Sequence, residues 1–154
     1  MQSMNDPIRM VLEATRRIAV VGASNKPDRA GNYVFAFLIR QGFDVVGVNP
    51  SLAGDTLHGR PVVATLDEAH ANHGRLDMVD IFRASDQVGP VVDDAVRLGA
   101  RTVWMQLGVV NEAAAAAAWA AGLTVIMDRC PMIEWQRLGL PSVGLHQARP
   151  RGTT

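Results

Sequence analysis

The chain has 154 residues, of which 48% are hydrophobic, and its 15 basic side chains balance 15 acidic ones. This length predicts one globular domain spanning residues 1–154, and the neutral charge balance excludes the general positive field that collects nucleic acid or an anionic membrane surface. Because no apolar run reaches the roughly 20 residues that span a bilayer and the first residues lack a signal-peptide core, we expect a cytoplasmic protein.

Five short apolar runs alternate with helical patterns along the chain. The predicted strands lie in the runs that begin at Arg17 (RIAVVGAS), Asp44 (DVVGVNP), Asp77 (DMVDIF), Thr102 (TVWMQLG) and Thr124 (TVIMDR). Nearly continuous apolar strands are typical of a parallel sheet that crossover helices bury on both faces. The sequence therefore predicts a doubly wound, Rossmann-like α/β domain with a five-stranded parallel sheet flanked by helices.

Capping residues and glycines mark the helices between these strands. A leading helix is expected after the cap Asp6, and a shorter helix is expected in the run LDEAHAN. The other predicted helices run from the cap Asn32 to Gly42, from Pro90 to Gly99, and from the cap Asn111 to Gly122. We expect the folded core to cover about residues 17–138 and the tail 139–154, rich in Gly, Pro and Arg, to be irregular.

The loop after the first strand, VVGASNKPDRAGNYV, holds the clearest ligand-binding pattern. Gly22 ends the strand where a tight turn is needed, and the start of the following helix favours a phosphate. The spacing to the next glycine, Gly31, is too long for the dinucleotide fingerprint G-x-G-x-x-G. Ser24, Lys26 and Arg29 suit a ligand that carries more phosphate charge than NAD. The alternative is a strand-to-helix turn with a solvated loop.

The end of the second strand carries Asn49 and Pro50, where a nicotinamide-binding domain usually has Asp or Glu for the ribose hydroxyls. An amide does not repel a phosphorylated ribose as a carboxylate does. Asn49 therefore favours an adenine nucleotide with a phosphate on its ribose, although Asn-Pro is also a common turn.

Polar side chains end the third and fourth strands, where burial on both faces would leave them without water. Arg83 offers a planar fork for a phosphate or a carboxylate, and Gln106 can both donate and accept hydrogen bonds. In a parallel sheet, these strand ends meet the loop after Gly22 at one edge, where ligands bind. The alternative is simple solvent exposure of the two side chains.

One residue is a candidate for covalent chemistry. Cys130 follows the fifth strand, beside Arg129 and before Pro131, close to a helix start that favours a reactive thiolate. The alternative is an inert cysteine in the core. A single cysteine excludes an internal disulfide, and His70 with His73, one helical turn apart, lacks a third ligand, so we expect no metal site.

Five motifs in order resemble one known family: VVGAS, VNP followed by LHGRPVVATLDE, DIFR, VWMQLGV and DRCPMIE. They resemble the small single-domain CoA-binding proteins related to the CoA-binding domain of the succinyl-CoA synthetase α subunit, from Arg17 to about Leu138. The resemblance implies coenzyme A or an acyl-CoA as the ligand. It implies that Gly22, Ala23, Ser24, Lys26, Arg29 and Asn32 surround the diphosphate, that Asn49 and Pro50 lie beside the adenosine, and that Arg83, Gln106 and Gly108 lie towards the pantetheine arm; Arg129 and Cys130 complete the predicted site.

The chain departs from the synthetase subunit in two respects. The subunit has a lysine closely after the proline of the second strand, where this chain has Ser51 and Leu52. The cation for the ribose phosphate is therefore expected from Lys26, Arg29 or Arg83. The chain also lacks the synthetase's second domain with its phosphorylated histidine, which favours binding without catalysis.

Three functions follow from these observations. The first is a module that binds CoA or an acyl-CoA, a small-molecule nucleotide, without catalysis of its own. The second is an enzyme that acts on a CoA thiol or thioester through Cys130, and the third is an NAD(P)-binding oxidoreductase, which Asn49 and the absent fingerprint disfavour. A homo-oligomer is also consistent with the sequence, because the alanine-rich helix after Asn111 suits packing on either the sheet or another subunit.

Overall fold

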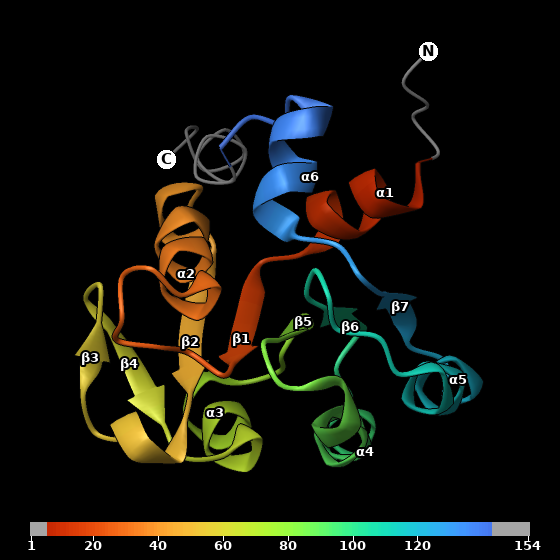
Figure 1. Ribbon diagram of the computed structural model, residues 1–154, viewed down its shortest axis with the longest axis horizontal. Coiled ribbons are helices and arrows are strands. Elements are labelled where there is room, and N and C mark those ends of the chain that lie inside the picture. Colours follow the sequence, from red (N-terminus) through yellow and green to blue (C-terminus); the bar gives the residue numbers. More distant parts are fainter. Residues whose placement is uncertain (1–5, 143–154) are drawn as a thin grey trace, which may run out of the picture.

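The computed structural model describes residues 6–142, which form a seven-stranded sheet between two layers of helices (Figure 1). The strands are β1 (Arg17–Val21), β2 (Asp44–Val48), β3 (Thr56–Leu57), β4 (Arg60–Val63), β5 (Met78–Ile81), β6 (Thr102–Met105) and β7 (Thr124–Ile126). Their order in the sheet is β3-β4-β2-β1-β5-β6-β7. Every pairing is parallel except that of β3 with β4. This arrangement confirms the predicted doubly wound α/β class.

Six α-helices in the described residues cover the two faces of the sheet. They are α1 (Pro7–Ala14), α2 (Ala30–Arg40), α3 (Leu66–His73), α4 (Val88–Arg97), α5 (Glu112–Ala120) and α6 (Pro131–Leu138), with short 3-10 turns at Pro50–Leu52 and Ser85–Gln87. One hydrophobic cluster joins α1, α2 and α6 to one face, and a second cluster joins α3, α4 and α5 to the other. None of these helices is long and apolar enough to cross a membrane.

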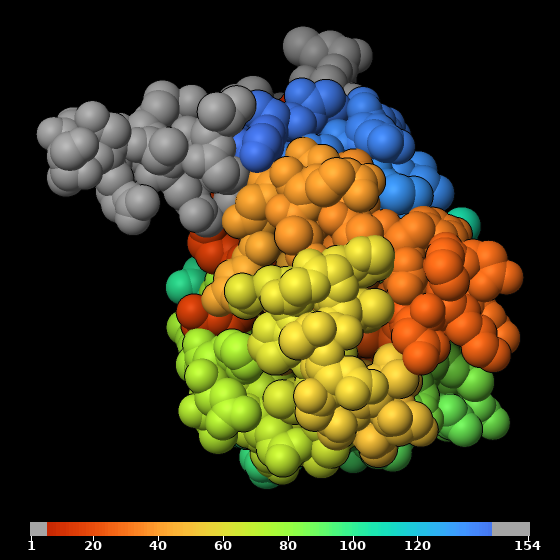
Figure 2. Space-filling view, turned by 90° about the vertical axis from the view of Figure 1, so that its left-hand side faces the viewer, coloured from red at the N-terminus to blue at the C-terminus, as the bar shows by residue number. Residues whose placement is uncertain are grey.

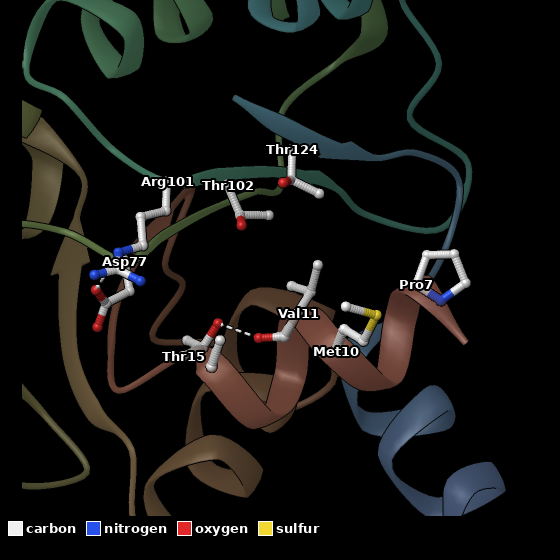
Figure 3. Close-up of a pocket in the computed structure, with 9 residues that line it drawn as sticks. Pro7, Met10, Val11, Thr15, Asp77, Arg101, Thr102 and Thr124 are labelled. Carbon is white, nitrogen blue, oxygen red and sulfur yellow. Dashed lines mark hydrogen bonds and ion pairs between the residues drawn. The ribbon is translucent and has the colours of Figure 1, made fainter. Parts of the chain in front are cut away.

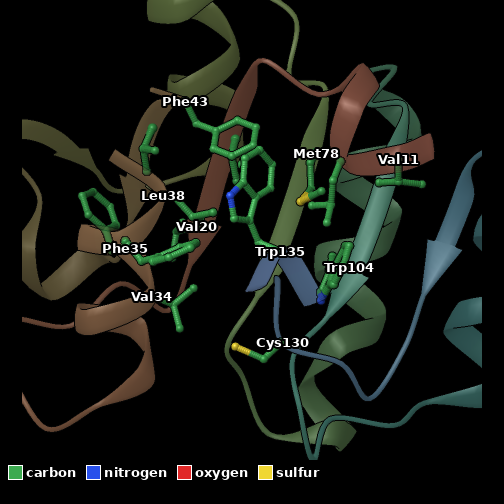
Figure 4. Packing of buried hydrophobic residues seen from close by; sticks show 14 of the residues in the cluster. Val11, Val20, Val34, Phe35, Leu38, Phe43, Met78, Trp104, Cys130 and Trp135 are labelled. Atoms are coloured by element: carbon green, nitrogen blue, oxygen red, sulfur yellow. The ribbon is translucent and has the colours of Figure 1, made fainter. Parts of the chain in front are cut away.

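Side chains of the central strands alternate between the two clusters, as the period of a β-strand requires. Trp104 packs in the cluster with α2 and α6, whereas the next residue, Met105, packs in the cluster with α4 and α5. Figure 4 shows Trp104 beside Met78 and Trp135 in the first cluster. Trp104 and Met105 are both fully buried. The last residues of β6 are therefore packed on both faces of the sheet.

The predicted number of strands was wrong, because the hairpin of β3 and β4 was not foreseen. β3 has two residues and pairs antiparallel with β4, which adds to the outer side of β2 through the register Gly47↔Val62 and Val48↔Val63. Pro61 lacks an N–H for a strand ladder, and a run of two residues shows no periodicity. The segment therefore gave no strand pattern in the sequence.

Two predicted helix starts were also wrong. α2 begins at Ala30 with Arg29 at the cap position, so Asn32 lies inside the first turn and is buried. α4 begins at Val88, two residues before Pro90. The caps Asp6 and Asn111 are confirmed, since the side chain of each accepts hydrogen bonds from the first turn of its helix. The tail predicted to be irregular lies outside the described residues from 143 onward.

Candidate functional site

The loop between β1 and α2 begins with a turn that only glycine can make. Gly22 has φ +94°, and a Cβ at this position would collide with the carbonyl oxygen of Phe82 at the end of β5. A Cβ on Gly31 would collide in the same way with the carbonyl oxygen of Gly22. The start of the loop, the start of α2 and the end of β5 therefore meet backbone to backbone.

Two asparagines hold this loop through their side-chain amides. Asn49, at the end of β2, donates from Nδ2 to the carbonyl oxygen of Ala23 (2.8 Å) and accepts at Oδ1 from the N–H of Ser51 (2.9 Å). Asn32 donates from Nδ2 to the carbonyl oxygen of Ser24 (2.9 Å). Each amide is committed to the protein, so these asparagines position the loop.

A cleft of about 280 Å³ opens between this loop and the ends of β5 and β6. Its lining residues come from the three segments that meet at the carboxyl edge of the parallel sheet. They are Gly22, Ser24, Arg29, Ala30, Gly31, Phe82, Arg83, Gln106, Leu107 and Val109. The cleft therefore lies at the edge where the sequence predicted a ligand site.

The loop side of the cleft is positive. α2 has no side-chain cap, since Arg29 at its cap position makes no such hydrogen bond, and Ala30 and Gly31 of its first turn line the cleft. Among the ion pairs of residues 6–142, none involves Lys26, Arg29 or Arg83. Among the described residues, Arg83 donates to the Oε1 of Gln87 alone (3.1 Å). Exposed cations beside a helix start form an anion-binding arrangement.

One residue that lines the cleft holds a buried acceptor. Gln106 is 6% exposed, and its buried Oε1 has no hydrogen-bond partner among residues 6–142. An unpaired buried acceptor costs stability, so a ligand that donates an N–H or O–H to it would recover that free energy.

Below the cleft, Asp80 is fully buried on β5 between Val20 and Trp104 of the neighbouring strands. Neither carboxyl oxygen has a hydrogen-bond partner within the part of the chain that the structure describes, and burial raises the pKa of Asp80 well above its ordinary value. The neutral form is therefore favoured. The carboxyl does not line the cleft.

The remaining predicted residues lie apart from the cleft wall. Cys130 is buried in the core beneath α2 and α6, in view near Trp104 in Figure 4. Arg129 is exposed, and its carbonyl oxygen accepts from the Nε1 of Trp104 (2.9 Å). Gly108 donates its N–H to Asp128 (2.8 Å). These contacts give each residue a structural partner.

The family described as "CoA binding domain" matches residues 16–136 of this chain. The chain belongs to this family. The match includes the loop after β1 and the ends of β2, β5 and β6, so the cleft lies wholly within the CoA-binding domain. The resemblance stated from the five sequence motifs is confirmed.

Relatives of similar size share the sequence and the fold of this CoA-binding domain. Protein YneT of Bacillus subtilis (strain 168) is 37% identical over 123 residues, which is 80% of this chain and 87% of YneT. The structure of cell-free ID.343 from Thermus thermophilus has a TM-score of 0.81 at 34% identity and covers 88% of this chain and 99% of its own. A hypothetical protein from Pyrococcus horikoshii OT3 has a TM-score of 0.80 at 31% identity and covers 91% and 100%.

The structure sorts the predicted site residues of the CoA-binding domain into three groups. Gly22, Ser24, Arg29, Arg83 and Gln106 line the cleft. Ala23, Asn32 and Asn49 hold the loop from behind, and Lys26, Pro50, Gly108, Arg129 and Cys130 do not line the cleft. Five further residues line the cleft: Ala30, Gly31, Phe82, Leu107 and Val109. Each is next in the chain to a predicted site residue, so the sequence located the segments that form the cleft.

A second hollow, of about 300 Å³, lies at the opposite edge of the sheet (Figure 3). Figure 3 shows it between α1, with Met10 and Val11, and the first residues of β6 and β7, Thr102 and Thr124. It has no glycine loop, and its one cation, Arg101, faces Asp77 at 3.7 Å. Of these two hollows, therefore, the cleft is the one that has the glycine turn and the unpaired cations expected of a nucleotide site.

Proposed function

We propose that this chain binds coenzyme A or an acyl-CoA in the cleft at the carboxyl edge of the sheet, without catalysis of its own. The observation that carries the proposal is the combination, in one cleft, of uncommitted cations and a buried acceptor without a partner. Coenzyme A carries phosphates at one end and an arm with two amides at the other. The two kinds of group in the cleft match the two ends of the ligand.

The phosphate end fits the loop side of the cleft. The helix start at Ala30 and Gly31 offers amides, and Arg29 adds a guanidinium that no acidic side chain of the described residues neutralises. Arg83 approaches from the end of β5, on the other side of the cleft. We assign the ribose phosphate to Arg29 or Arg83, since both line the cleft and Lys26 does not.

The amide arm fits the inner wall. Gln106 Oε1 would accept a hydrogen bond from a pantetheine amide, which removes the cost of its burial. Leu107, 58% exposed, and Val109 supply apolar surface beside it for the methylene groups of the arm. The amide and the apolar surface together favour an arm of this mixed chemistry over a purely charged ligand.

The two other functions have less support. Asn49, at the position of the acidic residue of nicotinamide sites, is occupied with Ala23 and Ser51 and offers no carboxylate for ribose hydroxyls. The thiol of Cys130 is 4% exposed and does not line the cleft. Neither observation favours NAD(P) chemistry or a thiol reaction.

The test is isothermal titration of the reduced protein with CoA, dephospho-CoA and NAD, on the wild type and on Arg29→Ala and Arg83→Ala. We expect CoA to bind and NAD not to bind. Removing the arginine that contacts the ribose phosphate should weaken the binding of CoA about 10-fold or more but leave the binding of dephospho-CoA nearly unchanged, which identifies that arginine.

The matched control is Arg40→Ala, because Arg40 ends the same helix at its other end, over the ring of Phe37. This variant should bind CoA as the wild type does. NAD binding in place of CoA would return the chain to the dinucleotide-binding class. Turnover of an acyl-CoA that Cys130→Ser abolishes would support the thiol enzyme.

A further inference from the structure

The hairpin of β3 and β4 contacts the start of α2 through one histidine, next to the loop of residues 22–29, here called the ligand loop. His58, at the hairpin tip, places Nε2 3.1 Å from Oδ1 of Asn32, in the first turn of α2. Its ring also lies against Phe35, with 6.3 Å between the ring centroids. Figure 2 shows the yellow hairpin segment directly against the orange α2 and beside the red-orange loop.

The direction of this hydrogen bond follows from the partners of Asn32. A backbone carbonyl oxygen can only accept, so the amide nitrogen of Asn32 faces the carbonyl of Ser24 and its Oδ1 faces His58. The Nε2 of His58 therefore donates. Asn32 is 6% exposed, so both ends of its amide are fixed away from solvent.

His58 adopts a backbone conformation that another residue would tolerate better. The tip, Leu57 to Arg60, has two central residues with positive φ, His58 at +49° and Gly59 at +81°. Such a two-residue turn prefers Asn or Gly at its first central position. A histidine here carries backbone strain, and its side-chain contacts with Asn32 and Phe35 offset that strain.

We propose that His58 is a positioning residue of the ligand loop, acting through Asn32. The hairpin at the edge of the sheet thereby fixes the carbonyl of Ser24 and the turn that leads to Arg29. This inference rests on the proposed function for the identity of the ligand. The fixing of the loop itself is independent of that identity, so the two can be tested apart.

Two substitutions separate the hydrogen bond from the fold of the hairpin. His58→Asn suits the positive φ but is too short to reach Asn32. His58→Gln keeps an N–H donor at a similar reach but is less suited to the turn. The matched control is His73→Asn, on α3, because His73 is distant in the chain from the hairpin and does not line the cleft.

The measurements are thermal unfolding, hydrogen exchange of peptides covering residues 22–29, and titration with CoA. We expect His58→Asn to unfold near the wild-type temperature, because a better turn residue offsets the lost hydrogen bond to Asn32. It should exchange faster in the loop and bind CoA about 3- to 10-fold more weakly. His58→Gln should unfold at a lower temperature and yet bind CoA more tightly than His58→Asn. His73→Asn should match the wild type in loop exchange and affinity.

Unchanged loop exchange in His58→Asn would overturn the positioning role, and so would CoA affinities that simply follow the unfolding temperatures. If the wild type does not bind CoA, the proposed function fails, but loop exchange in His58→Asn against His73→Asn still decides whether His58 fixes the loop. The two failures are therefore distinguishable.

Discussion

Asn49 ties β2 to the ligand loop by donating a hydrogen bond from its Nδ2 to the carbonyl oxygen of Ala23, 2.8 Å away. Its Oδ1 meanwhile accepts from the N–H of Ser51. Asn49, which the sequence predicted beside the adenosine, therefore links the end of β2 to the loop after β1, a contact that we call the brace.

Replacing Asn49 tests the brace. Asn49→Ala should lower the free energy of unfolding by about 1–2 kcal/mol, because one half-buried and one exposed hydrogen bond are lost. It should also weaken CoA binding, since the turn at Ala23 is released. Urea unfolding and titration measure both effects. Ser51→Ala is the control, because Ser51 contributes only its backbone N–H to this contact; a similar loss in both variants would contradict the brace.

Two glycines in helices should respond oppositely to alanine. In Gly31→Ala the new Cβ collides with the carbonyl oxygen of Gly22, and we expect a loss of about 1–3 kcal/mol and weaker CoA binding. In Gly89→Ala, on α4, the Cβ meets nothing, and we expect a gain of about 0.5–1 kcal/mol with unchanged CoA binding. Equal effects of the two substitutions on unfolding would show that the close approach at Gly31 does not matter.

Gln106→Leu separates stability from binding. The substitution removes a buried acceptor that has no partner, so the free energy of unfolding should stay constant or rise by about 1 kcal/mol. CoA affinity should fall about 5- to 10-fold, whereas the affinity for adenosine 3′,5′-bisphosphate, which lacks the pantetheine arm, should not change. Gln136→Leu, exposed on α6, is the control. A loss for both ligands would place Gln106 near the nucleotide instead.

Asp80 should make the protein less stable as the pH rises. Burial raises the pKa of Asp80 in the folded state above its ordinary value of 3.8, so in the pH range between these two values the folded state holds a proton that the unfolded chain has lost. The free energy of unfolding therefore decreases with increasing pH across that range. Well below pH 3.8 both states hold the proton, so Asp80 no longer makes the free energy of unfolding depend on pH there.

The measurement is urea unfolding of the wild type and of Asp80→Asn at several pH values from 4 to 8. The amide cannot ionise, so the variant should gain stability relative to the wild type as the pH rises. A constant difference across the series would mean that the ionisation of Asp80 is not linked to folding.

Much of the fold followed from local patterns in the sequence. The five apolar runs are strands of the sheet, and the caps Asp6 and Asn111 accept from the helices they precede. The hairpin of β3 and β4 did not follow, because its two-residue strand depends on pairing with residues already held by β2. Asn32 was misplaced as a cap because its partners, Ser24 and His58, were unknown.

The cleft followed from the sequence only in part. Arg29, Arg83 and Gln106 were predicted at the edge of the sheet and line the cleft, because polar groups at the ends of buried strands face the one side that stays open. Cys130 was an open question between the cleft and the core. Its burial with Trp104 and Trp135 depends on how α6 packs on the sheet, which no local pattern records.

The sequence by itself determined the class of the fold, the edge of the sheet that carries the cleft, and the glycine turn at Gly22, because periodicity and glycine conformation are local properties. Only the tertiary structure decided which polar side chains face the cleft and which hold the loop. Asn49 and Ala23 are 26 residues apart in the chain, as are His58 and Asn32, and each contact exists only once the sheet has brought its strands together. The sequence shows which side chains can donate or accept a hydrogen bond, but the packing of the strands and helices determines which partner each of them meets.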